Sequence, residues 1–324
     1  MLRHNYRTFL QPLRCASVWI NSSAQTSQNR EVDVEKVFCK TDVQSLLYDI
    51  TGLDMESKVF RERTIPQQQR SQYHLMTDNM LEETLKKFEE RGKKFLQLVP
   101  FKEPRAREFQ VLSKDPELVG FDQSKYVFTD ITFDATNRDR LVVIRETDGT
   151  LRTALPDEHD RMNRVYYEQP DRPVIPPKVF SDPQLSEALA KNKHEFIMDW
   201  ACYFFEPDCP DFVELSKKVF NDAIEKKKFQ LLYSTRHFGT LVYYSLLNNN
   251  IAPLLEYFGT KSDLQSAARV VCLYKTMYPD WRTAISSEDT PHRILQDYLK
   301  QNKPVIKRIP SLVAALEGKS KKES

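Results

Sequence analysis

The stretch KYVFTDITF, residues 125–133, decides the fold class, because aromatic and β-branched residues crowd it in a pattern typical of a β-strand. A second apolar run, LVVI at 141–144, follows after a polar connection. The dipeptide Asp148-Gly149 then favours a turn before LRTA at 151–154. Together the three pieces predict a small antiparallel meander of two or three strands.

Helical patterns follow this meander. Residues 157–167 return to a helical pattern, and four prolines between positions 170 and 177 mark a boundary in extended conformation. From Ser181 to about Leu316, apolar residues recur at helical spacing in successive stretches with short links. Such consecutive helices predict a set of packed antiparallel hairpins.

Two further helices are expected before the meander. Thr41 and Gln44 resemble a capping box, and the short helix that they begin should end at Gly52. A stronger helix begins near Thr77, where Leu81 opens a series of apolar residues at helical spacing.

Residues 1–30 have the composition of a mitochondrial transit peptide. They contain four arginines and six serines or threonines but no acidic residue. An ordinary disordered tail is the alternative interpretation. Without these arginines the chain keeps 44 basic and 46 acidic residues, so its net charge changes from +2 to −2. Contact with nucleic acid must therefore use local basic patches, because the rest of the chain has no overall positive field.

The sequence therefore predicts an α+β fold that is predominantly α-helical, with a small central antiparallel β meander followed by a C-terminal array of packed antiparallel helices. We expect four regions along the chain. They are a mitochondrial transit peptide over 1–30, an N-terminal α+β region over 31–172 with the meander near 125–154, a C-terminal helical region over 173–318, and a disordered basic tail over 319–324.

Composition argues against several classes of function. The chain has only seven glycines, no two closer than 20 residues, whereas phosphate-binding loops and dinucleotide turns need clustered glycines. No apolar run approaches the roughly 18 residues of a membrane span. No two of the six histidines have the spacing of metal ligands, and the five cysteines form neither a metal motif nor a disulfide framework. We expect no catalytic residue, cofactor, metal ion or small-molecule substrate.

One enzymatic alternative stays open at this point. Ser234, Arg236 and His237 are neighbours in sequence, but adjacent residues on a helix do not face one another. A matrix enzyme with an unfamiliar site would instead have to gather distant histidines, such as His159, His194 and His237, in one pocket.

Three segments are locally basic. Residues 86–107 carry eight basic and three acidic side chains, and residues 217–239 and 301–324 each carry six and two. In the second segment Phe229, Tyr233 and Phe238 are interleaved with basic residues, a composition that suits phosphate contact and base stacking. The alternative is that these aromatic residues belong to the core and that the lysines are solvated helix ends.

Several longer segments resemble the family of the mitochondrion-specific small-subunit ribosomal protein numbered twenty-two. The segments are KYVFTDIT (125–132), VVIRETDGTLR (142–152), DEHDRMNRVYY (157–167), YHLMTDNMLEETLKK (73–87), FEPD (205–208) and LLYSTRHFGTLVYY (231–244). The resemblance runs from about Leu46 to Tyr278, and after Pro279 nothing matches.

The resemblance implies a structural component of the mitochondrial small ribosomal subunit, located in the matrix, that contacts small-subunit rRNA and neighbouring ribosomal proteins. It implies no catalytic residue. A mitochondrial RNA-binding helical-repeat adaptor or a ribosome assembly factor is the alternative. As candidate rRNA or protein contacts we take ten basic residues: Arg138, Arg140, Arg145, Arg152, Arg161, Arg164, Lys226, Lys227, Lys228 and Arg236.

Overall fold

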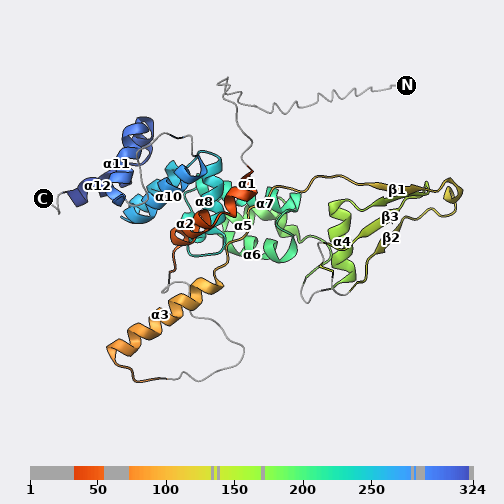
Figure 1. The fold of residues 1–324 in the computed structure, drawn as a ribbon, viewed down its shortest axis with the longest axis horizontal. Coiled ribbons are helices and arrows are strands. Elements are labelled where there is room, and N and C mark those ends of the chain that lie inside the picture. Colours follow the sequence, from red (N-terminus) through yellow and green to blue (C-terminus); the bar gives the residue numbers. More distant parts are fainter. Residues whose placement is uncertain are drawn as a thin grey trace, which may run out of the picture. The chain divides into compact units, whose positions relative to one another are not determined.

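A computed structural model of the chain describes residues 33–54, 73–132, 135–136, 139–168, 172–278, 281 and 289–320 (Figure 1). The expected transit peptide, Arg138 and residues 321–324 lie outside this part of the chain. Within it, helices predominate and four strands form one antiparallel sheet, which confirms the α+β, mostly helical class. None of the described helices is both long and apolar enough to cross a membrane.

The sheet contains the predicted meander and one additional strand. Its strands are β1 (Val111–Lys114), β2 (Tyr126–Thr129), β3 (Val142–Arg145) and β4 (Thr150–Thr153), in the order β1-β4-β3-β2. β2, β3 and β4 form the meander, as expected. β1 was not expected, and it pairs antiparallel with β4 around an irregularity between Val111 and Ser113.

One face of the sheet is covered and the other is open. Val142 and Ile144 alternate with half-exposed neighbours along β3 and are buried. The helix α4 (Pro156–Tyr166) lies on the side of this buried face, because Arg152 of β4 bonds to Glu158 of α4. Glu158 also accepts a hydrogen bond from the Leu155 N–H at 2.9 Å, which fixes the start of α4 after the sheet.

The remaining chain forms a helical core. Its elements after α4 are α5 (Gln184–Ala190), α6 (His194–Phe204), α7 (Pro210–Glu225), α8 (Phe238–Leu247), α9 (Ala252–Thr260), α10 (Leu264–Met277), α11 (Pro291–Gln301) and α12 (Pro310–Ser320), with short 3-10 turns between some of them. α8 is its most buried member, with eight of its ten residues buried. α8 has no polar face, and this is typical of a helix that lies at the centre of a core and is covered on every side.

Close approach between α9 and α12 depends on a glycine. A Cβ atom at Gly259 would lie 2.4 Å from the Leu312 main-chain nitrogen, far inside van der Waals contact. Beside it, the Glu256 carboxylate accepts hydrogen bonds from the N–H and the hydroxyl of Ser311, at 3.1 and 2.6 Å. α9 therefore packs against α12, and its Glu256 also accepts hydrogen bonds from donors at the N-terminus of α12.

The first helices of the described chain join the same core. They are α1 (Val34–Phe38) and α2 (Thr41–Thr51), and α2 packs against α8 and α10. The expected end at Gly52 is confirmed by its positive φ of 64°. The prediction of a capping box at Thr41 is wrong. Lys40 occupies the cap position, and the Gln44 side chain instead donates to the Phe38 carbonyl.

The helix expected near Thr77 is α3 (Asp78–Phe95), and the Thr77 hydroxyl accepts the Met80 N–H at its start. Near its other end, Gly92 lies against Leu53, which leaves room for close contact at that point. The apolar residues in the first part of α3 are exposed, in contrast to those of α8.

Candidate functional site

The arginines of the meander bond within the protein. Arg140 is buried, donates to the carbonyls of Asp130 and Thr132, and stacks over the Tyr167 ring at 4.1 Å. Arg152 is buried and forms ion pairs with both Glu146 and Glu158 at 2.7 and 2.8 Å. These two side chains connect the sheet to its surrounding loops and to α4. Their N–H donors are used in these internal contacts and are therefore not free to bind a phosphate.

Arg145 and Arg164 are also held by internal partners. The Arg145 guanidinium donates to Asp115 at 2.7 Å. Arg164 is buried, donates to the Val174 carbonyl at 3.1 Å, and lies 4.7 Å from the centre of the Phe204 ring. Arg164 thereby joins α4 to α6, whereas Arg161 on the same helix is exposed and has no partner within the described residues.

The lysines after α7 differ in accessibility. Lys226 is exposed and pairs with Asp222, and Lys228 is half-buried and donates to the Leu189 carbonyl at 3.2 Å. Lys227, between them, is exposed, and no described residue pairs with its ammonium group. Among these candidates, Lys227 therefore offers the ammonium group that is least engaged.

The aromatic residues of this segment belong to the core. Phe229 and Phe238 are fully buried, and Tyr233 packs edge-on against Phe238 at 5.3 Å between ring centres. Base stacking needs an accessible ring face, so these rings do not provide a stacking platform. The interpretation of the aromatic residues as core is the one that the structure supports.

Arg236, His237 and Ser234 do not form a catalytic arrangement. Arg236 and His237 both approach the same Asp199 oxygen, each at 2.8 Å, while the Ser234 hydroxyl accepts the Asp54 N–H. Burial lowers the pKa of His237, although the hydrogen bond with Asp199 opposes this effect. Among the described residues no base bonds to the Ser234 hydroxyl, and the buried His237 ring is engaged by the Asp199 carboxylate.

The three histidines of the enzymatic alternative have separate partners. His159 approaches the Arg140 carbonyl at 2.8 Å, and His194 approaches Asp222 at 2.8 Å.

Burial raises the pKa of the Cys202 thiol to about 11, which disfavours the reactive thiolate. Within the described residues, no group of three or more histidine, cysteine, aspartate or glutamate side chains could hold a metal ion.

A basic patch lies at the turn before α12. It belongs to the segment 301–324, which the sequence identified as locally basic. Lys303, Lys307 and Arg308 are exposed there, and none of the described residues pairs with them. Because they are neighbours on one short 3-10 element, they can approach adjacent phosphates together.

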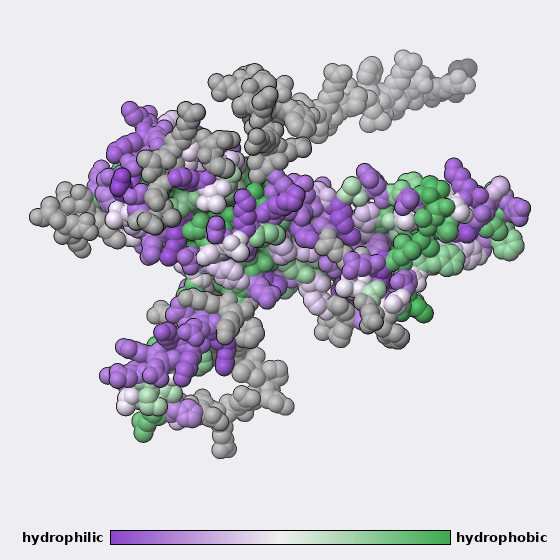
Figure 2. Space-filling model, in the orientation of Figure 1, coloured by the Kyte–Doolittle hydropathy of each residue, from purple (hydrophilic) through white to green (hydrophobic). Residues whose placement is uncertain are grey.

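Exposed apolar residues gather on the sheet. Of the 23 large apolar side chains that are exposed in the described chain, ten lie between Phe109 and Leu141. Figure 2 shows apolar residues collected over the strands. The register places Tyr126 opposite Arg145, and Phe128 opposite Val143, on the face that α4 does not cover. We call this surface the open sheet face: Tyr126, Phe128, Val143, Arg145 and Leu151.

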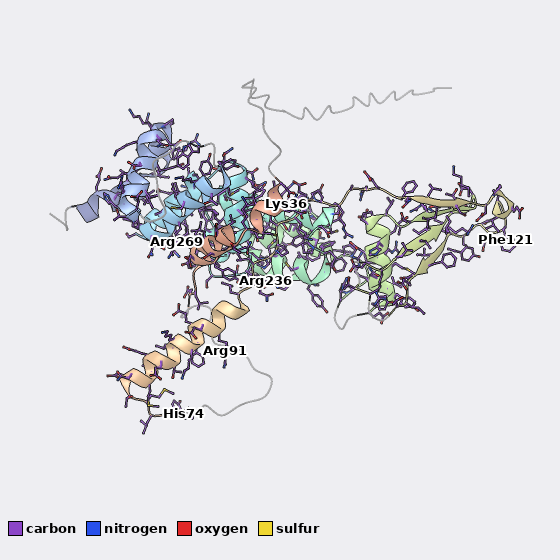
Figure 3. All side chains as sticks on the ribbon, viewed as in Figure 1. Lys36, His74, Arg91, Phe121, Arg236 and Arg269 are labelled. Atoms are coloured by element: carbon purple, nitrogen blue, oxygen red, sulfur yellow. The ribbon has the colours of Figure 1, made fainter. Side chains whose placement is uncertain are left out.

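A second apolar surface lies on α3. Leu81, Leu85 and Phe88 share one side of this helix and are each 38% to 49% exposed, and we call them the α3 stripe. Figure 3 shows Arg91 farther along the same helix. The sequence predicted the apolar side of this helix but not its exposure, since periodicity alone cannot tell a core face from an interface. Exposed contiguous apolar surface of this kind marks a binding region.

Comparison with known proteins identifies the family to which this chain belongs. A family model described as mitochondrial 28S ribosomal protein S22 matches residues 36–279. The small ribosomal subunit protein mS22 of Mus musculus is 34% identical over 268 residues, which cover 83% of this chain and 74% of that protein. The Bos taurus protein of the same name is 33% identical, over 80% of this chain and 72% of its own. The chain therefore belongs to the mitochondrial 28S ribosomal protein S22 family.

Proposed function

We propose that this chain is a structural component of the small subunit of the mitochondrial ribosome, where it supports mitochondrial translation. The observation that carries the proposal is family membership over residues 36–279, which include the sheet and the greater part of the helical core. The protein then works in the mitochondrial matrix, and residues 1–30 serve as its transit peptide, as their arginine-rich, acid-free composition favours.

The role is non-enzymatic and rests on many modest contacts. The exposed cations Arg161, Lys227, Lys303, Lys307 and Arg308 are the best placed to meet rRNA phosphates, because internal ion pairs do not engage them in the described chain. Arg140, Arg152 and Arg164 stabilise the fold around these surfaces. Small local patches suit this chain because its expected mature form has no net positive charge.

Neighbouring proteins bind the apolar surfaces. Helical geometry places Asp78 and Glu82 along one edge of the α3 stripe, and Arg91 along the other. A partner helix with an apolar stripe and the opposite order of charges is complementary to both edges. α3 thus supplies a protein contact in addition to the RNA contacts.

Sedimentation of mitochondrial lysate tests the proposal. The full-length chain with a C-terminal tag should sediment with small-subunit rRNA in a sucrose gradient. Removal of residues 1–30 should leave the tagged chain outside mitochondria. The proposal fails if the imported protein sediments only as a free monomer, no heavier than the 38.1 kDa of the full chain.

The second candidate is an RNA-binding adaptor or assembly factor, which the exposed basic residues favour. A salt series separates it from the first, because phosphate contacts weaken steeply as salt rises. An integral component stays with the particle in high salt, whereas an adaptor that binds mainly through Lys303, Lys307 and Arg308 leaves it. An assembly factor also appears on precursor particles and is absent from mature subunits.

A further inference from the structure

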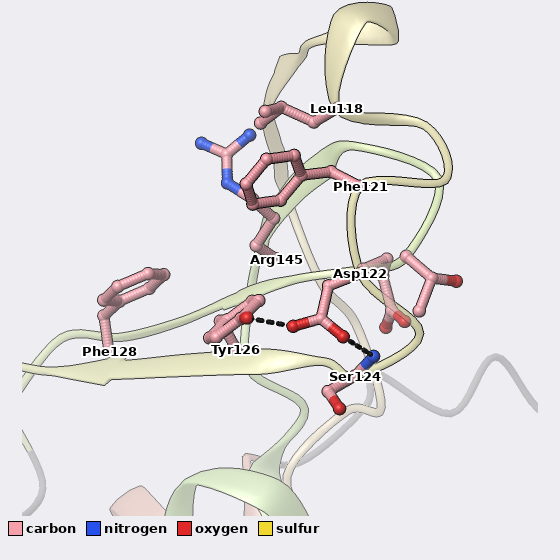
Figure 4. A pocket seen from close by; sticks show the side chains of 9 residues that line it. Leu118, Phe121, Asp122, Ser124, Tyr126, Phe128 and Arg145 are labelled. Carbon is pink, nitrogen blue, oxygen red and sulfur yellow. Dashed lines mark hydrogen bonds between the residues drawn. The ribbon is translucent and has the colours of Figure 1, made fainter.

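A cavity of about 370 Å³ opens at one end of the open sheet face (Figure 4). Its volume is within the range of about 300–1,000 Å³ that is common for ligand pockets. Its apolar walls come from the loop before β2 and from β2 itself: Leu118, Phe121, Tyr126 and Phe128. Figure 3 shows Phe121 near the end of the sheet, where its ring is 82% exposed. So large an exposed aromatic surface costs hydration free energy unless something covers it.

Three charged residues line the same cavity, and two of them are already paired. Arg145 is held by Asp115 at 2.7 Å, and Glu146 is held by Lys125 at 2.8 Å. The third is Asp122, which accepts hydrogen bonds from the Tyr126 hydroxyl and from the Ser124 N–H at 3.1 Å (Figure 4). Both donors are neutral, and no cation of the described residues pairs with Asp122.

The Asp122 carboxylate is ionised at neutral pH. The hydrogen bond from the Tyr126 hydroxyl, with smaller help from main-chain N–H groups, holds the pKa of Asp122 below its usual range. The cavity therefore combines a negative charge with exposed aromatic ring faces. A cation can interact with this combination in two ways, through an ion pair with the carboxylate and through cation–π contact with the rings.

We infer that this cavity receives a basic side chain, arginine in preference to lysine, from a neighbouring protein of the small ribosomal subunit. The inference rests on the proposed function. A planar guanidinium can lie on the ring of Phe121 or Phe128 while its N–H groups donate to Asp122. The apolar wall then covers the aliphatic part of the same side chain.

RNA is the poorer occupant of this surface. A phosphate near the cavity would meet the negative charge of Asp122, which no cation of the described residues pairs with. The nearby cations, Lys125 and Arg145, are neutralised by their own carboxylates. Aromatic rings alone would accept stacked bases, so the charge decides between the two partners.

Site-specific photocrosslinking in intact small subunits tests the inference. The probe is p-benzoylphenylalanine in place of Phe128, in the otherwise complete chain. Ultraviolet light should join it to a peptide of a subunit protein that presents an arginine or lysine next to the crosslinked position. Asp122→Asn, which keeps the shape of the side chain, should lower the crosslink yield roughly threefold to tenfold, on the scale of one lost hydrogen bond.

Two controls keep the result interpretable. Ile175→Ala removes an exposed apolar side chain outside the cavity and should leave the yield unchanged. Sedimentation of each variant with the subunit shows that the protein is folded and assembled. A crosslink to rRNA, no crosslink, or a yield that ignores Asp122→Asn overturns the inference. Each of those results, with normal sedimentation, leaves the proposed ribosomal function intact.

Discussion

The hydroxyl of Tyr243 donates a hydrogen bond to the main-chain oxygen of Val34 at 2.7 Å, across 209 residues of sequence. The Tyr243 ring also packs edge-on against Phe38 of α1, with 5.0 Å between ring centres. One central tyrosine of α8 therefore anchors the first helix of the described chain to the helical core. Burial raises the pKa of Tyr243, in keeping with a phenol that stays neutral in this position.

Tyr243→Phe should lower the free energy of unfolding by about 0.5–1.5 kcal/mol, because the ring packing is kept while one buried hydrogen bond is lost. Urea denaturation of the purified chain measures the change. Tyr244→Phe is the matched control, since that hydroxyl bonds to Asn221 at an exposed position. An equal loss in both variants would show that the bond to Val34 has no special weight.

The sequence was sufficient for elements whose pattern is local. The apolar run LVVI and the turn at Asp148-Gly149 predicted the meander, and Thr77 marked the start of α3. β1 was missed because its four residues gain their partner only from β4, nearly 40 positions later. Gly259 lies inside α9, although glycine often marks the end of a helix, because its close contact with Leu312 is long-range and cannot be seen in the local sequence.

The candidate contacts could be predicted less well than the fold. A lysine or arginine in sequence does not reveal whether a carboxylate lies beside it, and Arg152 finds Glu146 and Glu158 only through the sheet and α4. Phe121 gave no signal for the cavity, because it is a single aromatic residue in a polar loop. An amphipathic pattern marks an apolar face, but only the structure shows whether that face is covered.

Arg152→Ala should destabilise the sheet and α4 by about 3 kcal/mol, near the low end of the range for breaking a buried ion pair, because both carboxylates keep some contact with water. Arg152→Lys should recover only part of the loss, since an ammonium cannot reproduce the forked hydrogen bonds. Thermal unfolding of the full chain reports both effects. Arg161→Ala, on the exposed side of α4, is the control, and we expect a change within about 0.5 kcal/mol.

Gly259→Ala should cost about 1–3 kcal/mol, because the added methyl group meets the main chain of Leu312 and forces α9 and α12 apart. Gly318→Ala provides the comparison, since nothing lies within 4 Å of a Cβ atom at that position of α12. There the substitution should be neutral or slightly stabilising, as alanine favours helices. Equal unfolding midpoints for the two variants would contradict the close approach of the two helices.

The stability of the core should fall as the pH decreases from 7 to 5. Burial lowers the pKa of His237 and of His194, so the folded rings stay neutral where the unfolded rings, with a pKa of about 6.5, take up protons. The unfolded state then binds more protons, and the free energy of unfolding decreases with decreasing pH. His159 has a raised pKa and opposes part of this trend.

His237→Gln should therefore flatten the pH dependence between pH 5 and 7, even though it also lowers stability at pH 7. Denaturation midpoints at several pH values measure the slope. His74→Gln, at an exposed position before α3, should retain the slope of the unmodified chain. If His237→Gln also retains it, the burial of His237 is not what makes stability depend on pH.

We expect substitutions in the α3 stripe to affect assembly into the small subunit and to leave the stability of the chain unchanged. Leu85→Asp should leave the free energy of unfolding within about 0.5 kcal/mol of the original, because the side chain is exposed. The same change should lower incorporation into the small subunit, since a carboxylate in an apolar interface loses its hydration. Glu83→Gln, on the opposite side of α3, is the control for a change of charge on the same helix. Quantitative sedimentation of tagged variants gives the bound fraction. A loss of stability without a loss of incorporation would show that Leu85 packs inside this protein and does not meet a neighbour.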